Sequence, residues 1–128
     1  MPDADTTLQD LRERVAAFVH ERDWEQFHTP KDLASAIAIE AAELMELFLW
    51  RSVSEVEAVA TGSESRHKVQ DELADVLILC LSLANRLEID TADAVLRKID
   101  SNRAKYPPDV VRGSAEKYTY YRAECADS

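Results

Sequence analysis

Two pairs of acids are the residues of this chain whose types and spacing point most clearly to chemistry. Glu40 and Glu43 are three positions apart, and Glu72 and Asp75 repeat that spacing later in the chain. Residues three apart lie on one face of a helix. Apolar residues surround both pairs, so at least part of each pair faces other protein. Burying ionised carboxylates without compensation is costly, and four that converge also repel one another.

Divalent metal ions would relieve this cost. Mg²⁺, or Mn²⁺ as a substitute, binds oxygen ligands, and two helices that each present an acid pair can supply them. The candidate metal ligands and catalytic residues are therefore Glu40, Glu43, Glu72 and Asp75. In the alternative interpretation the acids form a solvated face or pair with Lys and Arg. A di-iron centre typically needs Glu-x-x-His on two helices, and no histidine completes either pair.

A basic segment follows the second acid pair, with the sequence KIDSNRAKYP from residue 98 to 107. Lys98 and Asn102 are four apart and share a helix face, where an ammonium and an amide could both contact phosphate oxygens. Arg103 could add a planar guanidinium fork. The alternative is the common enrichment of cations in the last turns of a helix, where they stabilise its dipole.

The elements that must position these residues are predicted to be helices. Apolar periodicity and capping residues indicate helices over residues 6–22, 31–50, 53–60, 64–88 and from a Thr91 cap to the Pro107-Pro108 pair. Two glycines and four prolines are too few for a sandwich or barrel of short strands. We expect an all-α, four-helix-bundle-like single domain over residues 1–128, with a helical core at about 6–107. The short helix is additional to the bundle, and the C-terminal arm, 108–128, is expected to be irregular.

Charge and composition exclude several classes of function. The net charge of −10 would repel a nucleic-acid polymer, and an anionic ligand would need metal ions or a local basic cluster. The longest apolar run is far too short to span a bilayer, and the acidic start lacks the basic region of a signal peptide. We therefore expect a cytoplasmic protein without a membrane partner. A core this small also favours assembly of several copies.

Taken together, the two acid pairs and KIDSNRAKYP resemble the MazG-like, all-α nucleoside triphosphate pyrophosphatase superfamily. The segments RDWEQFH (22–28), AELMELFLW (42–50) and DELADVLI (71–78) are similar to its dCTP pyrophosphatase branch. One departure from the wider superfamily is Ile39, where many members carry the first acid of Glu-Glu-x-x-Glu; the dCTP-like branch also lacks it. This leaves open which carboxylate activates water.

The resemblance implies a MazG-type fold and Mg²⁺-dependent hydrolysis between the α and β phosphates, which yields a nucleoside monophosphate and pyrophosphate. It implies metal binding by the four acids and phosphate or nucleotide contacts by Lys98, Asn102, Arg103 and Tyr106. The base would be bound by Trp24, His28 and Trp50. Both tryptophans could instead serve only packing. Family members assemble as dimers or tetramers with sites near subunit interfaces, so a homodimer or homotetramer is expected.

The predicted function is house-cleaning hydrolysis of dCTP or modified deoxycytidine triphosphates in nucleotide metabolism. Two alternatives remain at this stage. One is a pyrophosphatase of broad specificity that acts on non-canonical nucleotides. The predicted connection at 23–30 contains three ring-bearing side chains, Trp24, Phe27 and His28, and this aromatic loop favours base selectivity without separating cytosine from its modified forms. The other is a non-catalytic helical module that binds nucleotides, in which the acids are only a solvated face.

Overall fold

A computed structural model describes residues 1–121, and in this range the chain forms helices and no strands. The predicted all-α fold class is confirmed for this part of the chain. No helix here combines the length and apolar character that crossing a bilayer requires. The chain divides into two compact units, an N-terminal unit at Met1–Ile89 and a C-terminal unit at Asp90–Ser128.

The N-terminal unit contains four α-helices, and each was predicted to within a few residues except at the end of the second. They are α1 (Leu8–Glu21), α2 (Pro30–Glu46), α3 (Val53–Val59) and α4 (Ser63–Arg86), with 3-10 turns η1 (Asp3–Asp5) and η2 (Glu25–Phe27). Three of these helices begin with an N-cap side chain that accepts a backbone hydrogen bond. Thr7 forms a capping box with Asp10, and Thr29 accepts from the Asp32 amide ahead of Pro30 in the first turn.

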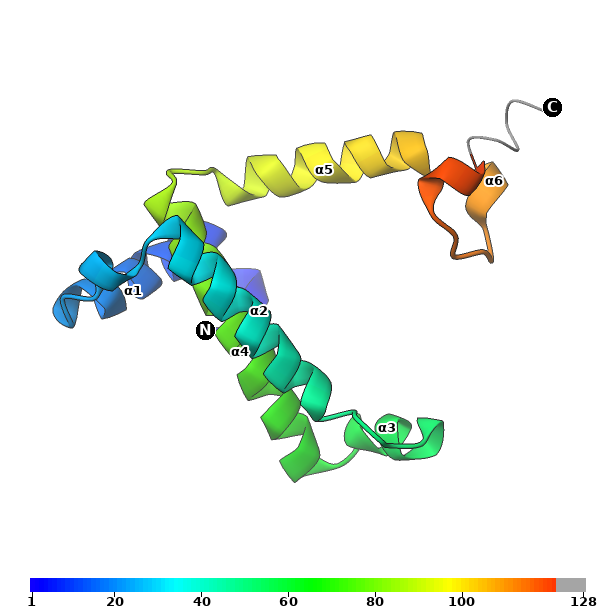
Figure 1. The fold of residues 1–128 in the computed structure, drawn as a ribbon, viewed down its shortest axis with the longest axis horizontal. Coiled ribbons are helices and arrows are strands. Elements are labelled where there is room, and N and C mark those ends of the chain that lie inside the picture. Colours follow the sequence, from blue (N-terminus) through cyan, green and yellow to red (C-terminus); the bar gives the residue numbers. More distant parts are fainter. Residues whose placement is uncertain (122–128) are drawn as a thin grey trace. The chain divides into compact units, whose positions relative to one another are not determined.

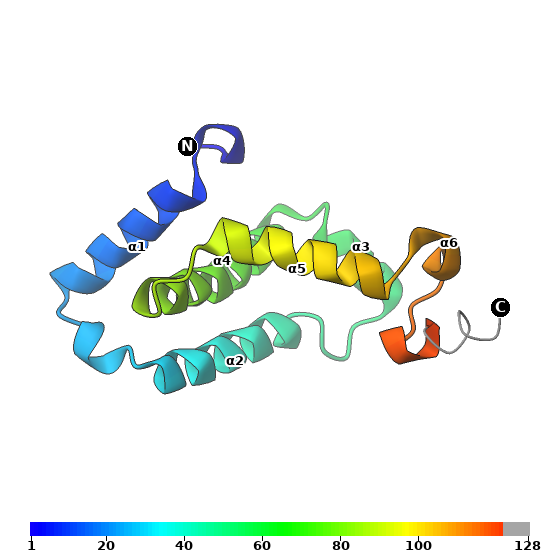
Figure 2. The same cartoon turned by 90° about the horizontal axis from the view of Figure 1, so that it is seen from above.

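Helices α2 and α4 form the centre of this unit and run antiparallel, side by side (Figures 1 and 2). Helix α1 also packs on α4. The buried side chains Val19, Leu33, Leu81 and Ala84 come from these three helices. Arg12 on α1 donates to Asn85 on α4 at 2.9 Å, and Asn85 donates back to the Arg12 carbonyl at 3.0 Å. The α2–α4 pairing brings the two acid pairs to facing stripes.

Helix α2 ends at Glu46, whereas the composition of 31–50 predicted a helix through Trp50. After Glu46 the backbone hydrogen bonds join residues three apart, which is the pattern of a 3-10 helix. An example is the bond from the Phe48 amide to the Met45 carbonyl at 3.0 Å. Trp50 then adopts a left-handed backbone conformation with φ of 62°, which no helix can continue through. The composition of this segment, which is rich in helix-forming residues, therefore did not predict the end of the helix at Glu46.

The C-terminal unit contains α5 (Thr91–Lys105), α6 (Pro108–Val111) and a helical turn at 118–121. The cap of α5 is Asp90, which accepts from the Asp93 amide, and not Thr91 as predicted. The prediction of an irregular arm was wrong at 108–111, because Pro108 fixes the first turn of a new helix. Tyr121 is 2% exposed, and its hydroxyl accepts from the Glu116 amide and donates to Ser114. Residues 122–128 of the predicted arm lie outside the described range.

Candidate functional site

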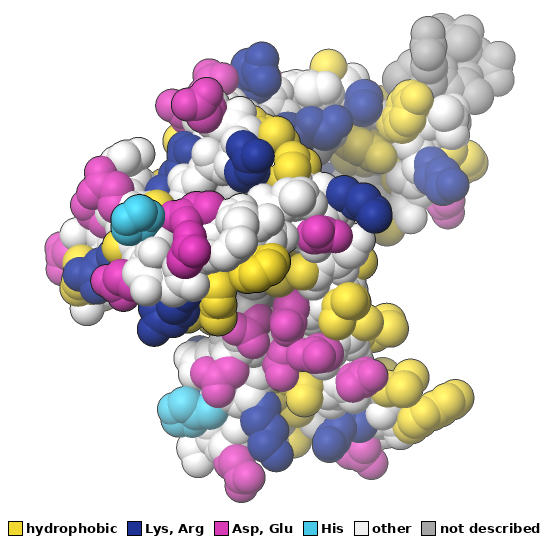
Figure 3. Space-filling model, turned by 60° about the vertical axis from the view of Figure 1, so that its left-hand side comes forward, with side chains coloured by type: hydrophobic (Ala, Val, Ile, Leu, Met, Phe, Trp, Pro, Cys, Tyr) yellow, Lys and Arg dark blue, Asp and Glu magenta, His cyan; other side chains and the backbone are white. Residues whose placement is uncertain are grey.

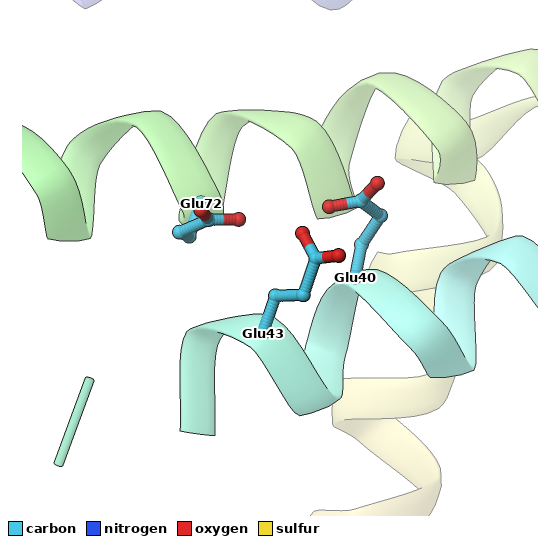
Figure 4. A group of neighbouring side chains, drawn as sticks. All are labelled: Glu40, Glu43 and Glu72. Atoms are coloured by element: carbon cyan, nitrogen blue, oxygen red, sulfur yellow. The ribbon is translucent and has the colours of Figure 1, made fainter. Parts of the chain in front are cut away.

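Three of the four predicted acids converge between α2 and α4. Glu40 and Glu43 point from α2 toward Glu72 on α4 (Figure 4). One carboxylate oxygen from each lies within 4.8 Å of the others. The spacing of three within α2 and the antiparallel pairing with α4 produce this convergence, as the sequence predicted.

The buried oxygens of this group lack partners. Glu40 and Glu72 are half-buried, and the Oε2 atom of each is inaccessible and has no hydrogen-bond partner among residues 1–121. Buried acceptors without partners are rare because they lose hydration without compensation. Hard divalent cations use carboxylate oxygens as ligands, so these residues fit the metal ion that the sequence predicted. Glu43 is exposed and completes the group from the solvent side.

The negative charges of this group favour the binding of protons or cations, and the pKa values of two of its carboxyl groups are raised. The pKa of Glu40 is raised first by a hydrogen bond to the Glu43 carboxyl and then by burial and the surrounding negative charges. Burial is the main cause that raises the pKa of Glu72, and the charges of Glu43 and Asp75 add to it. Figure 3 shows acidic side chains gathered on one face of the molecule beside hydrophobic ones. A divalent cation would relieve the repulsion within the group.

Asp75 lies beside the three converging glutamates without belonging to their mutually close group. Its negative charge raises the pKa of both Glu40 and Glu72, which places it within electrostatic reach of the two buried acids. Its side chain lines a cavity together with Glu40. The predicted fourth ligand is therefore at the site, at the edge that faces this cavity.

The cavity beside the acids is lined by two of the three predicted base-binding residues, Trp24 and His28. It has a volume of about 190 Å³ and is lined by Phe18, Val19, Trp24, His28, Glu40, Asp75, Ile78, Leu79 and Ser82. The Trp24 ring packs edge-on against Phe18 at 5.7 Å between centroids and lies 6.3 Å from the His28 ring. Trp24 is 41% exposed, so its ring is available to a ligand. The cavity thus combines two carboxylates with aromatic and apolar side chains.

A larger cavity of about 470 Å³ adjoins the first, because both are lined by Val19, His28 and Ser82. Its other lining residues include Val15 and Ala16 on α1 and Asn85 and Arg86 near the end of α4. The sequence predicted a helix over residues 6–22 without assigning its residues to a site, and Ser82 was not among the predicted site residues. The signal for Ser82 was its place seven residues after Asp75, which returns to the same helix face.

The remaining predicted residues are Trp50 and four residues of the C-terminal unit. Trp50 is 94% exposed and lines neither cavity. Lys98, Asn102, Arg103 and Tyr106 belong to α5 and its C-cap in the C-terminal unit. Arg103 pairs with Asp100 at 3.6 Å, and the Tyr106 ring packs on Tyr121 at 5.8 Å. Their roles toward phosphate remain predictions.

Comparison with known proteins gives consistent results. A model of the MazG-like family matches residues 35–120. Mouse dCTP pyrophosphatase 1 is 48% identical over 113 residues, which cover 88% of this chain and 66% of the mouse protein. Bovine dCTP pyrophosphatase 1 is 46% identical over 116 residues, which cover 91% and 69%. This chain therefore spans about two thirds of the length of these curated relatives.

A solved structure shares the fold. The crystal structure of a pyrophosphatase from Archaeoglobus fulgidus aligns with a TM-score of 0.73 at 39% identity. The alignment covers 84% of this chain and 98% of the archaeal chain. The helical arrangement that pairs the acids is thus shared with that protein over nearly its whole length.

Proposed function

The chain belongs to the MazG-like family, and from this premise we propose that it hydrolyses dCTP, or a modified deoxycytidine triphosphate, to the monophosphate and pyrophosphate. The observation that carries the proposal is the convergence of Glu40, Glu43 and Glu72, of which Glu40 also lines a cavity with Trp24 and His28. The names of the mouse and bovine relatives support dCTP as the substrate, and that of the archaeal structure supports the pyrophosphatase reaction.

Glu40, Glu43, Glu72 and Asp75 would hold Mg²⁺, for which Mn²⁺ can substitute. When bound, the metal ion offsets the negative charge of the triphosphate and lowers the pKa of water. The orphaned Oε2 atoms of Glu40 and Glu72 are the natural ligands, because they have no partner among residues 1–121. A carboxylate oxygen of the group that is not itself a metal ligand would take the proton from the attacking water.

The basic residues of α5 would bind the phosphates. Lys98 and Arg103 stabilise the negative charge that develops on the pyrophosphate as it leaves, as cationic groups do in other phosphoryl transfers. Asn102 shares a helix face with Lys98 and adds an amide donor. Tyr106 contributes a nucleotide contact. No covalent nucleophile is required, since water attacks the α-phosphorus directly.

The ring-bearing side chains that line the cavity would bind the base. Trp24 offers an indole face, and His28 adds a polar group to the same cavity. Trp50 lines neither cavity of its own chain and is 94% exposed. We therefore place its base contact in a second copy of the chain. This agrees with assembly as a homodimer or homotetramer, because a bare tryptophan on the surface favours burial in an interface.

The experiment is a panel of substrates. The purified protein is incubated with Mg²⁺ and each of the eight canonical nucleoside triphosphates plus 5-methyl-dCTP, and products are separated by anion exchange. We expect monophosphate and pyrophosphate, formed fastest from the deoxycytidine nucleotides. Diphosphate and orthophosphate would contradict the reaction, and equal turnover of all nine would contradict the base preference.

A further inference from the structure

Ser82 on α4 has a buried hydroxyl without a partner. The residue is 7% exposed, and its Oγ atom has no hydrogen bond within the described residues. Serines inside helices commonly donate to the carbonyl four residues earlier. Ser35 on α2 does so, with Oγ 3.0 Å from the Lys31 carbonyl. Because an unpaired buried hydroxyl is unfavourable, the exception at Ser82 favours a partner from outside the described residues, such as a bound ligand.

The position of Ser82 connects it to the acids. Asp75, Leu79 and Ser82 follow one another at spacings of four and three on α4, so they share a helix face. The seven residues from Asp75 to Ser82 rise by about 10 Å along the helix axis. All three line the same cavity as Glu40. A nucleotide with its α-phosphate at the acids would extend its base toward Ser82.

The other lining residues leave few acceptors for a base. Beyond the carboxylates, the lining side chains are apolar or aromatic except His28 and Ser82. Trp24 has only an N–H donor, whereas a serine hydroxyl both donates and accepts. The exocyclic amino group of cytosine is a donor that needs an acceptor once it is buried. Ser82 Oγ is buried, unpaired and in the wall of the cavity, as such an acceptor should be.

We propose that Ser82 is a specificity-determining residue whose hydroxyl accepts a hydrogen bond from the exocyclic amino group of the cytosine base. This inference rests on the proposed function, since it takes a deoxycytidine triphosphate as the ligand. Ser82, Val19 and His28 line both cavities. The Ser82 hydroxyl would therefore contact the base at the point where the smaller cavity adjoins the larger one. The contact would fix the orientation of the ring at that point.

The test compares two substrates. The Ser82→Ala variant and the wild type are assayed with dCTP and with the triphosphate of 2-pyrimidinone deoxyriboside, which lacks the amino group. We expect Ser82→Ala to lower kcat/KM for dCTP about five- to tenfold, the effect of one hydrogen bond, and to leave the analogue unchanged. Unaltered turnover of dCTP, or the same loss with both substrates, would overturn the role of Ser82. Wild type that fails to hydrolyse dCTP would overturn the proposed function itself.

A second readout needs no turnover. In the protein without nucleotide, Ser82→Ala removes an unpaired hydroxyl, so its Tm should equal or exceed that of the wild type. A lower Tm would mean that Oγ already has a partner in the free protein, which would overturn the proposal. Ser35→Ala is the matched control, because this helical serine is exposed and bonded to its own helix. It should leave kcat/KM for both substrates unchanged.

Discussion

Glu40 on α2 and Glu72 on α4 bring carboxylate oxygens within 4.8 Å of one another, and each keeps its Oε2 atom buried without a hydrogen-bond partner in residues 1–121. The packing of the two central helices therefore holds like charges together. Such an arrangement stabilises nothing by itself, because both burial and repulsion disfavour the ionised forms. It is explained if a divalent cation binds between the helices.

Metal binding should stabilise the fold. Mg²⁺ at a hundred times its Kd would add about 2.7 kcal/mol to the free energy of unfolding, and Tm should rise by several degrees. Glu43→Gln should abolish this rise because it removes one of the three converging carboxylates. Glu46→Gln, one turn later on α2 and outside the group, should keep it. The measurement is differential scanning fluorimetry with and without Mg²⁺, and an identical rise in Glu43→Gln would remove that residue from the metal site.

Stability without metal should fall as the pH rises. The pKa values of Glu40 and Glu72 are raised above the ordinary value of 4.5, so between 4.5 and the raised values the folded state binds more protons than the unfolded state. The free energy of unfolding therefore decreases with pH across this window. Urea unfolding in EDTA at a series of pH values from about 4.5 upward should show a weaker decrease for Glu72→Gln than for the wild type. The exposed Glu64→Gln on the same helix is the control, and its decrease should match that of the wild type; parallel curves for Glu72→Gln would contradict the assignment.

The indole of Trp24 should matter for base selection. Trp24→Ala is expected to raise KM for dCTP about tenfold, within the range of one lost stacking contact, and to raise KM for dATP less. Phe27→Ala is the matched control, because Phe27 belongs to the same aromatic segment, is 63% exposed and lines neither cavity. Steady-state kinetics with both nucleotides measures the effect. Equal increases for dCTP and dATP would assign Trp24 to packing alone.

Trp50 of one copy of the chain should bind the base in the site of another copy. Trp50→Ala copies retain the acids but cannot supply the tryptophan, whereas Glu43→Gln copies supply it but lack a complete acid group. Mixing the two impaired variants under conditions that exchange subunits should raise the activity above the sum that the two give separately. Mixed Glu43→Gln and Glu72→Gln copies should stay inactive if both acids act within one chain. No recovery in the first mixture would place the action of Trp50 within its own chain.

The sequence predicted those features whose signal is local. A spacing of three defines a helix face without any knowledge of packing, so Glu40 with Glu43 and Glu72 with Asp75 could be recognised directly. The helices of the N-terminal unit followed from apolar periodicity in the same way. The aromatic segment at Trp24 and His28 was recognised from composition, and the structure places both residues in the cavity beside the acids.

Other features depend on interactions that a linear pattern does not contain. The end of α2 at Glu46 reflects a switch to tighter backbone bonds among good helix formers. The cap of α5 depended on whether Asp90 or Thr91 takes the extended conformation, and both residue types are good caps. Ser82 and Ser35 are both serines inside helices, and they differ in burial and in hydrogen bonding. Burial of that kind is decided by tertiary packing.

The most direct measurement for the central claim is hydrolysis of dCTP in water enriched in ¹⁸O, with Mg²⁺ present and the products analysed by mass spectrometry. If the acids of α2 and α4 direct water to the α-phosphorus, the label will enter dCMP and the pyrophosphate will remain unlabelled. Label in the pyrophosphate, or release of labelled orthophosphate, would contradict attack at the α-phosphorus and with it the account of this site.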